Sequence, residues 1–241
     1  MDIVERLLRD RPKFHLMGTT RWDATIGTLR AVQALVHDGD RTLETGCGAS
    51  TVIFVARGAN HTTISPEAEE HKLVRDYLKQ IDVDDNRLEC IVGESDSVLP
   101  TFRSERMLDI AFVDGGHAFP YPVIDWHYMS RLLKVGGSLV IDDIPIPSVA
   151  CAFRFMQADP SWRLDSILDK RAAVFTLIDE PSYGDYNLQA FNRRFDYGFA
   201  PLPSRARLIL SSRATRMLRQ IGLRYPALRQ VWKRYSHAAS D

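Results

Sequence analysis

The sequence predicts an α/β fold with a doubly wound, mostly parallel seven-stranded sheet and one antiparallel edge strand. Three observations predict it. The segment LETGCGAST at residues 43–51 combines a strand end, a glycine turn and a helix start. Two apolar runs, at residues 108–114 and 138–143, end in aspartates, as expected of parallel strands that are buried on both faces. Strand and helix patterns alternate along the chain until two strand-like segments follow each other directly.

The elements before residue 100 follow from local signals. The dipeptide Ser65-Pro66, followed by Glu67, Glu69 and Glu70, predicts a helix with Ser65 as its N-cap and Pro66 at its first position. The predicted elements in this half are a helix at 24–36, a helix at 49–57, a strand at 61–64, a helix at 66–81 and a strand at 87–92.

The second half repeats the alternation and then reverses it. Gly136 and Gly137 predict the stop of a helix and a turn into the next strand. The turn Asp169-Lys170-Arg171 predicts a hairpin, which supplies the antiparallel edge. The predicted elements are strands at 107–114 and 138–142, helices at 122–133 and 146–158, and the hairpin strands at 162–168 and 172–178.

Composition excludes several classes of protein. With 241 residues, 45% of them hydrophobic, the chain can bury the core of one α/β domain with appendages. Neither a run of eighteen apolar residues nor the apolar core of a signal peptide is present, so we expect a cytoplasmic protein. Cys47, Cys90 and Cys151 are spaced too widely for a disulfide framework or a zinc motif.

The glycine turn differs from the dinucleotide-binding fingerprint, which would need a third glycine at Thr51. Instead, Glu44-x-Gly46-x-Gly48-x-Ser50, followed by FVDGGH at 112–117 and LLKVGGSLVIDD at 132–143, resembles class I S-adenosylmethionine (SAM) methyltransferases with their Rossmann-like fold. The segments are most similar to the small-molecule O-methyltransferases that include macrolide-sugar and cephalosporin-type enzymes. The resemblance covers roughly residues 20–180. It implies an N-terminal cap segment at 1–37 and a SAM-binding catalytic domain at 38–192.

The resemblance also implies a cofactor site. Gly46 and Gly48 would let the backbone pass under the methionine part of SAM. Glu44 would either fix the turn or meet the ammonium group through water. Relatives end the second strand in an acid that holds the ribose hydroxyls, whereas this chain has Ser65 there, and Glu67 is a candidate substitute. The remaining cofactor candidates are Ser50 in the turn, Glu94 and Ser95 on the adenine side, and Asp114.

For the chemistry, Asp114, Asp142 and Asp143 form a candidate site for Mg²⁺ or a similar divalent cation, because hard cations prefer oxygen ligands. Asp114 and His117 are the candidate catalytic residues, with His117 as the proton acceptor. The macrolide-sugar branch has a second aspartate where this chain has Gly116, so the base is either His117 or a metal-bound hydroxide network.

The expected function is methyl transfer to a hydroxyl of a small molecule. Two alternatives stay open: an enzyme of the same fold with other chemistry, such as aminopropyl transfer, and a catalytically silent SAM-binding module. Residues 193–241 form a basic, helical C-terminal arm with only Asp196 and Asp241 as acids. We expect this arm to contact an anionic membrane or its own or a neighbouring subunit, and we expect no nucleic acid partner.

Overall fold

The computed structural model describes residues 2–15 and 24–180, and beyond them residues 186, 189–193, 196–198, 200–202, 204–211 and 217. The chain divides into two compact units, Met1–Phe191 and Asn192–Asp241. The first unit contains the sheet and the helices that pack on its two faces. In the second unit, residues 204–211 are helical. Residues 16–23 of the predicted N-terminal cap lie outside the described residues, as does most of the predicted C-terminal arm.

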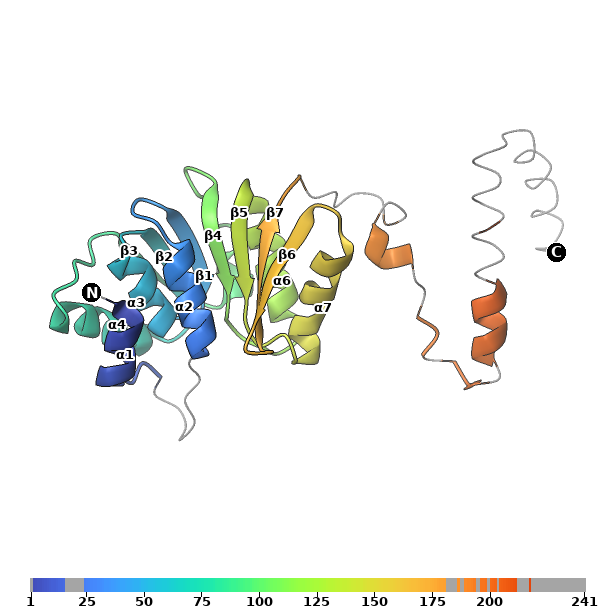
Figure 1. Cartoon of the computed structure of the whole chain (residues 1–241), viewed down its shortest axis with the longest axis horizontal. Helices are drawn as coiled ribbons and strands as arrows, with labels where there is room; N and C mark the ends of the chain where they lie inside the picture. The colour runs from blue at the N-terminus through green and yellow to red at the C-terminus, as the bar shows by residue number, and fades with distance from the viewer. Residues whose placement is uncertain are drawn as a thin grey trace. The chain divides into compact units, whose positions relative to one another are not determined.

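A seven-stranded sheet of order β3-β2-β1-β4-β5-β7-β6 forms the centre of the first unit (Figure 1). Strands β1 to β5 run parallel, and β7 runs antiparallel to both of its neighbours, β5 and β6. The strands are β1 (Arg41–Thr45), β2 (Asn60–Ser65), β3 (Leu88–Val92), β4 (Leu108–Val113), β5 (Leu133–Ile141), β6 (Trp162–Leu168) and β7 (Ala172–Leu177).

Helices cover the sheet on both faces, because its central strands are apolar on both. In β4, Ile110 and Phe112 pack into the cluster formed with α1 to α4, while Ala111 and Val113 pack into the cluster formed with α6 and α7. The helices are α1 (Ile3–Asp10), α2 (Ile26–Leu35), α3 (Ala49–Ala56), α4 (Ala68–Gln80), α5 (Ser95–Val98), α6 (Tyr121–Leu132) and α7 (Pro147–Ala158), with the 3₁₀ turn η1 (Ala190–Arg193).

The predicted fold class is confirmed, including the reversal near one edge. The reversed strand is β7, and its hairpin partner β6 closes that edge. Two local predictions were wrong. Ser65 is the last residue of β2 rather than a helix N-cap, and α4 begins at Ala68. The segment around Gly136 and Gly137 belongs to β5, which already begins at Leu133, rather than to a turn.

The strand order indicates where a ligand-binding crevice lies. From β1 the chain moves outward to β2 and β3, and it then returns to β4 on the other side of β1. Ligands of open α/β sheets bind at the carboxyl ends of the strands where the order reverses. Here that point lies at the ends of β1 and β4, where Thr45 pairs with Val113.

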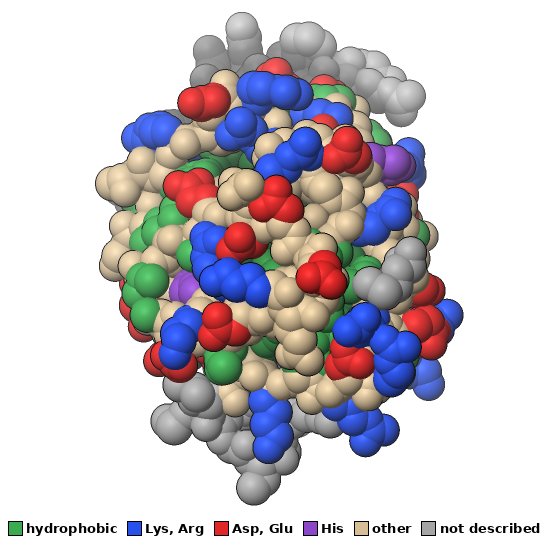
Figure 2. Space-filling view, turned by 90° about the vertical axis from the view of Figure 1, so that its left-hand side faces the viewer, with side chains coloured by type: hydrophobic (Ala, Val, Ile, Leu, Met, Phe, Trp, Pro, Cys, Tyr) green, Lys and Arg blue, Asp and Glu red, His purple; other side chains and the backbone are tan. Residues whose placement is uncertain are grey.

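The surface carries no obvious large apolar face on the side shown in Figure 2, where acidic and basic side chains are interspersed. This face therefore offers no extended basic patch. Among the helices in the described ranges, none combines the length and apolar character that crossing a membrane would require.

Candidate active site

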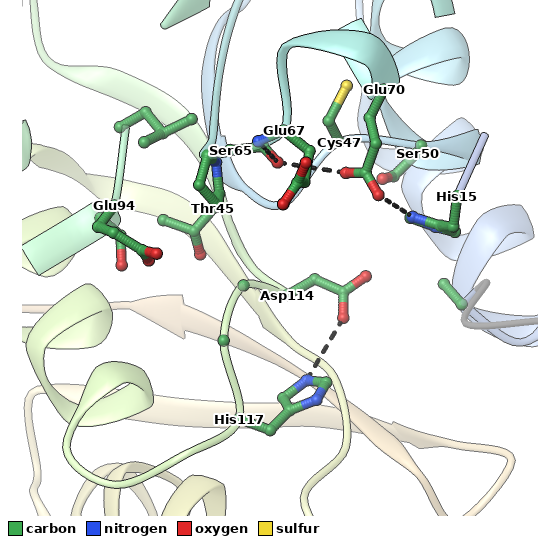
Figure 3. A pocket seen from close by; sticks show the side chains of 18 of the residues that line it. His15, Thr45, Cys47, Ser50, Ser65, Glu67, Glu70, Glu94, Asp114 and His117 are labelled. Carbon is green, nitrogen blue, oxygen red and sulfur yellow. Dashed lines mark hydrogen bonds and ion pairs between the residues drawn. The ribbon is translucent and has the colours of Figure 1, made fainter. Parts of the chain in front are cut away.

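A cavity of about 300 Å³ lies at the carboxyl ends of β1, β2 and β4 (Figure 3). Its walls come from His15, the glycine turn, the segment after β2, the start of α5 and the loop after β4. Apart from Glu44, all the cofactor residues expected from the sequence line it. The lining residues are His15, Ala24, Thr45, Gly46, Cys47, Gly48, Ala49, Ser50, Ile64, Ser65, Pro66, Glu67, Glu70, Glu94, Ser95, Asp114, Gly115, Gly116 and His117.

Gly46 is the residue of the turn that must be a glycine. Its φ is +97°, and a Cβ added there would lie 2.5 Å from the carbonyl oxygen of Asp114. Its own N–H donates to the carbonyl of Ile64 at 2.8 Å, which ties the turn to β2. Gly48 is in extended backbone, and a Cβ there would lie 3.4 Å from His15 Nε2. The turn thus brings two strand ends together at the floor of the cavity.

Glu44 lies beneath the turn and does not line the cavity. Its side chain is buried, with Oε2 accepting a hydrogen bond from Ser50 Oγ at 2.7 Å and Oε1 lying 3.0 Å from His61 Nε2. The Thr51 hydroxyl also donates to Glu44, and it accepts from the N–H of Gly48 at 2.9 Å. These contacts belong to the first of its two expected roles, fixing the turn.

Opposite the turn, the adenine-side candidates Glu94 and Ser95 stand at the start of α5. Glu94 is exposed, and Ser95 is buried close to an acid that the sequence did not single out, Asp125 of α6. Asp125 is fully buried, and burial raises the pKa of its carboxyl to about 6, with the hydroxyls of Ser95 and Thr45 opposing the rise. Gly115 leaves room for it, because a Cβ at Gly115 would lie 3.0 Å from Asp125 Oδ2.

At the second strand end, Ser65 and Glu67 both line the cavity, together with Glu70 from the first turn of α4. The Ser65 hydroxyl donates to Glu70 Oε2 at 3.2 Å. Glu70 Oε1 lies 2.8 Å from His15 Nδ1. Figure 3 shows the Glu70 carboxylate held between Ser65 and His15.

Across the cavity, Asp114, His117 and Asp143 lie together, with one ligand atom of each within 4.8 Å of the others. His117 Nε2 is 3.4 Å from Asp143 Oδ2 and 3.8 Å from Asp114 Oδ1. Burial raises the pKa of Asp114 well above its usual value, and the neighbouring carboxylates of Asp142, Glu44 and Asp143 add to this rise. A cation near these three residues would favour the ionised form of Asp114.

Arg171 supplies a positive charge from the turn between β6 and β7. Its Nε donates to Asp143 Oδ1 at 2.6 Å and its Nη2 to Oδ2 at 3.1 Å, while Asp143 adopts a φ of +56°. The same turn holds α2, because Asp169 Oδ2 accepts from the N–H of Gly27 at 2.9 Å. This turn therefore contacts both the acidic group and the helix that follows the N-terminal segment.

Asp142 is not part of this group of possible metal ligands, although its charge contributes to the raised pKa of Asp114. Its side chain is buried, and its Oδ1 is 3.7 Å from Arg171 Nε. Burial raises the pKa of Asp142, and Arg171 opposes this effect. The structure thus brings Asp114 and Asp143 together with His117 and leaves Asp142 outside the group.

Four polar residues at or beside the cavity were not predicted: His15, Glu70, Asp125 and Arg171. An acid within the apolar pattern of residues 122–133 was a visible signal for Asp125. His15 and Arg171 meet partners that are distant in sequence, and local patterns carry no signal for such pairs. Glu70 lies 22 residues beyond Gly48, and this spacing was available as a signal.

Comparisons with known proteins agree with this geometry. A sequence profile of a family described as "Methyltransferase domain" matches residues 43–144. No curated protein has a significant sequence match to the chain. This match covers the segment that carries the methyltransferase motifs of the sequence, and it agrees with the resemblance that they indicated.

Solved structures show the same fold at low identity. Cofactor-bound Rv0187 from MTB is 20% identical over 75% of this chain and 91% of its own, with a TM-score of 0.59. The O-methyltransferase TomG from Streptomyces achromogenes is involved in tomaymycin synthesis and was solved in complex with SAM. It is 18% identical over 74% of this chain and 91% of its own, with a TM-score of 0.58. A putative caffeoyl-CoA O-methyltransferase from Staphylococcus aureus is 15% identical over 73% of this chain and 92% of its own, with a TM-score of 0.54.

Proposed function

We propose that this chain, whose residues 43–144 form a methyltransferase domain, is a SAM-dependent O-methyltransferase that acts on a small hydroxylated molecule. One observation carries the proposal. The glycine turn and the pair Asp114 and His117 line the same cavity, so a ligand on the turn would lie beside a candidate base. The SAM-bound state of a protein with this fold supports the choice of cofactor.

The residues on the cavity walls fit the parts of SAM. Gly46 and Gly48 line the cavity without side chains, so the methionine part can approach the backbone there closely. The polar start of α5, at Glu94 and Ser95, suits the edge of the adenine ring. SAM supplies a methyl group on a sulfonium sulfur, and the acceptor oxygen bonds to that methyl group as the S–CH₃ bond breaks and S-adenosylhomocysteine (SAH) forms.

His117 takes the proton from the acceptor hydroxyl in this proposal. It lies on the loop after β4, and it lines the cavity beside Asp114. The carboxylate of Asp143 stabilises the imidazolium that forms, because its Oδ2 lies 3.4 Å from His117 Nε2 and opposite charges at that distance attract. Ser148 Oγ donates to the carbonyl of His117 at 2.5 Å, which fixes the loop.

A divalent cation, Mg²⁺ or a similar ion, fits the same group. Asp114, His117 and Asp143 would hold it, since two carboxylates and one imidazole lie close together, and burial and the neighbouring carboxylates raise the pKa of Asp114. When bound, the ion supplies a Lewis acid that lowers the pKa of the acceptor hydroxyl. Arg171 already balances part of the charge on Asp143, so the ion would share this carboxylate with Arg171.

The test is transfer of a labelled methyl group from SAM to a panel of sugars, catechols and polyketide phenols. His117→Gln is expected to reduce the rate at least about 100-fold while SAH binding is kept, and His127→Gln on α6 serves as the matched control. Full activity after exhaustive chelation would reject the cation and leave His117 as a simple base. SAH binding without turnover on any acceptor, with Mg²⁺ present, would contradict the proposed transfer.

A further inference from the structure

Glu70 places an ionisable carboxylate in the cavity at the end of β2. It belongs to the first turn of α4, where the free N–H groups of the helix favour negative charge. Its side chain is 14% exposed, and it lines the cavity. Spacing alone does not choose between the acids here: Glu67 and Glu70 lie 19 and 22 residues beyond Gly48, and both are near the 20 residues at which an acid meets the ribose in nucleotide-binding α/β folds.

The Glu70 carboxylate is fixed from two sides. Ser65 Oγ donates to Oε2 at 3.2 Å, and His15 Nδ1 lies 2.8 Å from Oε1. An ionised carboxylate has about four acceptor sites, so each oxygen keeps capacity for a further donor. A group held in this way and open to the cavity suits two neighbouring hydroxyls, each of which donates to one oxygen.

Glu67 lacks these supports. It occupies the N-cap position of α4 without a side-chain capping bond, and it is exposed. An exposed carboxylate loses more conformational entropy on binding than one that its neighbours already hold. Of the two acids, Glu70 is the better arranged to hold a diol.

His15 connects Glu70 to the glycine turn. Its Nδ1 contacts Glu70, and its Nε2 lies beside Gly48, where an added Cβ would be 3.4 Å away. His15 is also the last described residue before the 16–23 segment. A residue from the N-terminal part of the chain thus helps to shape the wall around a bound nucleoside.

We propose that Glu70, positioned by Ser65 and His15, is the carboxylate that accepts hydrogen bonds from the two ribose hydroxyls of the cofactor. The inference rests on the proposed function, because it assumes an adenosine-type ligand. It assigns to α4 the contact for which the second strand has no acid, and it makes His15 a positioning residue of the cofactor site.

The experiment measures the dissociation constants of SAH and of its 2′-deoxy and 3′-deoxy counterparts for the full chain by calorimetry. Glu70→Gln is expected to weaken SAH binding about 10-fold or more and to weaken the deoxy compounds much less, because the hydroxyl that met the carboxylate is already gone. Glu69→Gln is the matched control, since Glu69 is a neighbouring exposed acid that pairs with Lys72.

His15→Gln tests the positioning role. It should weaken SAH binding in the wild-type background and have little further effect in Glu70→Gln, which a merely structural role would not produce. Equal losses for SAH and the deoxy compounds in Glu70→Gln would overturn the inference, as would a ribose-specific loss in Glu67→Gln instead. If the wild type binds no SAH at all, the proposed function fails first. Unfolding midpoints of all variants distinguish lost binding from lost folding.

Discussion

Single residues of the glycine turn differ in how much they can change. Gly46 combines a positive φ with contact to the neighbouring strand end, whereas Gly39 has a positive φ of +84° with nothing within 4 Å of an added Cβ. A side chain added at either position would therefore strain the backbone, but only at Gly46 would it also clash with a neighbouring atom.

Gly46→Ala is expected to lower the free energy of unfolding by clearly more than Gly39→Ala, which should cost about 1–2 kcal/mol for its left-handed backbone alone. The Cβ at residue 46 must push the carbonyl of Asp114 away, so SAH binding should fall as well. Urea unfolding and calorimetry measure the two effects. Equal destabilisation by both variants would mean that the loop after β4 moves freely.

Asp125 makes stability depend on pH in a predictable direction. Its pKa is raised to about 6 by burial, so the folded protein holds this proton up to a higher pH than the unfolded chain does. The free energy of unfolding should therefore fall as pH rises from about 4 to above 6. Raising a carboxyl pKa from near 4 to about 6 costs the ionised folded state roughly 3 kcal/mol.

Asp125→Asn should remove that part of the pH dependence. Compared with the wild type, the variant should therefore gain free energy of unfolding at pH 7 relative to pH 4. Denaturant unfolding of variant and wild type between pH 4 and 7.5 gives the difference directly. Other acids with raised pKa values, such as Asp114, remain in both proteins and cancel. Two parallel stability curves would show that Asp125 is not buried as a neutral acid.

At the scale of elements, the strands were the most predictable part. Apolar runs such as residues 108–113 are buried on both faces, which is the condition that makes their pattern continuous. The short helix α5 and the helix α1 were not predicted. Ser95–Val98 is too short for a periodic pattern, and α1 depends on Asp2, whose Oδ1 accepts from the N–H groups of Val4 and Glu5.

The site was predictable where it follows a strand and not where it depends on packing. Gly46, Asp114 and His117 lie directly after β1 and β4, so their sequence neighbours reveal them. His15 and Arg171 meet Glu70 and Asp143 across 55 and 28 residues of sequence. Which acid such a residue meets depends on the three-dimensional arrangement of elements, and this arrangement is not contained in any local window of sequence.

The edge hairpin should therefore matter for turnover. Arg171→Ala removes the bidentate partner of Asp143 and leaves the adjacent acids without their counterion. We expect the methyl-transfer rate to fall about 10-fold or more, with a much smaller change in the dissociation constant of SAH, because Arg171 does not line the cavity. Lys170→Ala, an exposed neighbour in the same turn, is the control. An unchanged rate would show that Asp143 takes no part in the chemistry.

At the scale of the whole molecule, charge is distributed unevenly along the chain. The full sequence is formally neutral, yet from residue 193 onward the basic residues far outnumber Asp196 and Asp241. Within the described part of the second unit, several large apolar side chains are exposed: Leu202, Ile209, Leu210 and Met217. Basic and apolar side chains together suit an anionic membrane surface, and we propose this contact for the second unit.

A chain that ends at residue 191 should keep its SAH affinity and its cooperative unfolding, because the sheet and the cavity belong to the first unit. It should lose binding to vesicles that contain anionic lipid, which the full chain should bind more strongly than zwitterionic vesicles. Sedimentation of protein with both vesicle types measures this. Loss of folding or of self-association in the short chain, with no vesicle binding by the full one, would favour packing on its own or a neighbouring subunit.

The turn at residues 169–171 also has a consequence for the order in which the site is completed during synthesis. Asp142 and Asp143 leave the ribosome before Arg171, and the glycine turn leaves long before either. Until the β6–β7 hairpin forms, a nascent chain can hold a complete glycine turn while its acidic residues still lack their counterion and the start of α2 lacks Asp169. The capacity to bind the nucleoside should thus arise earlier in synthesis than the capacity to transfer a methyl group.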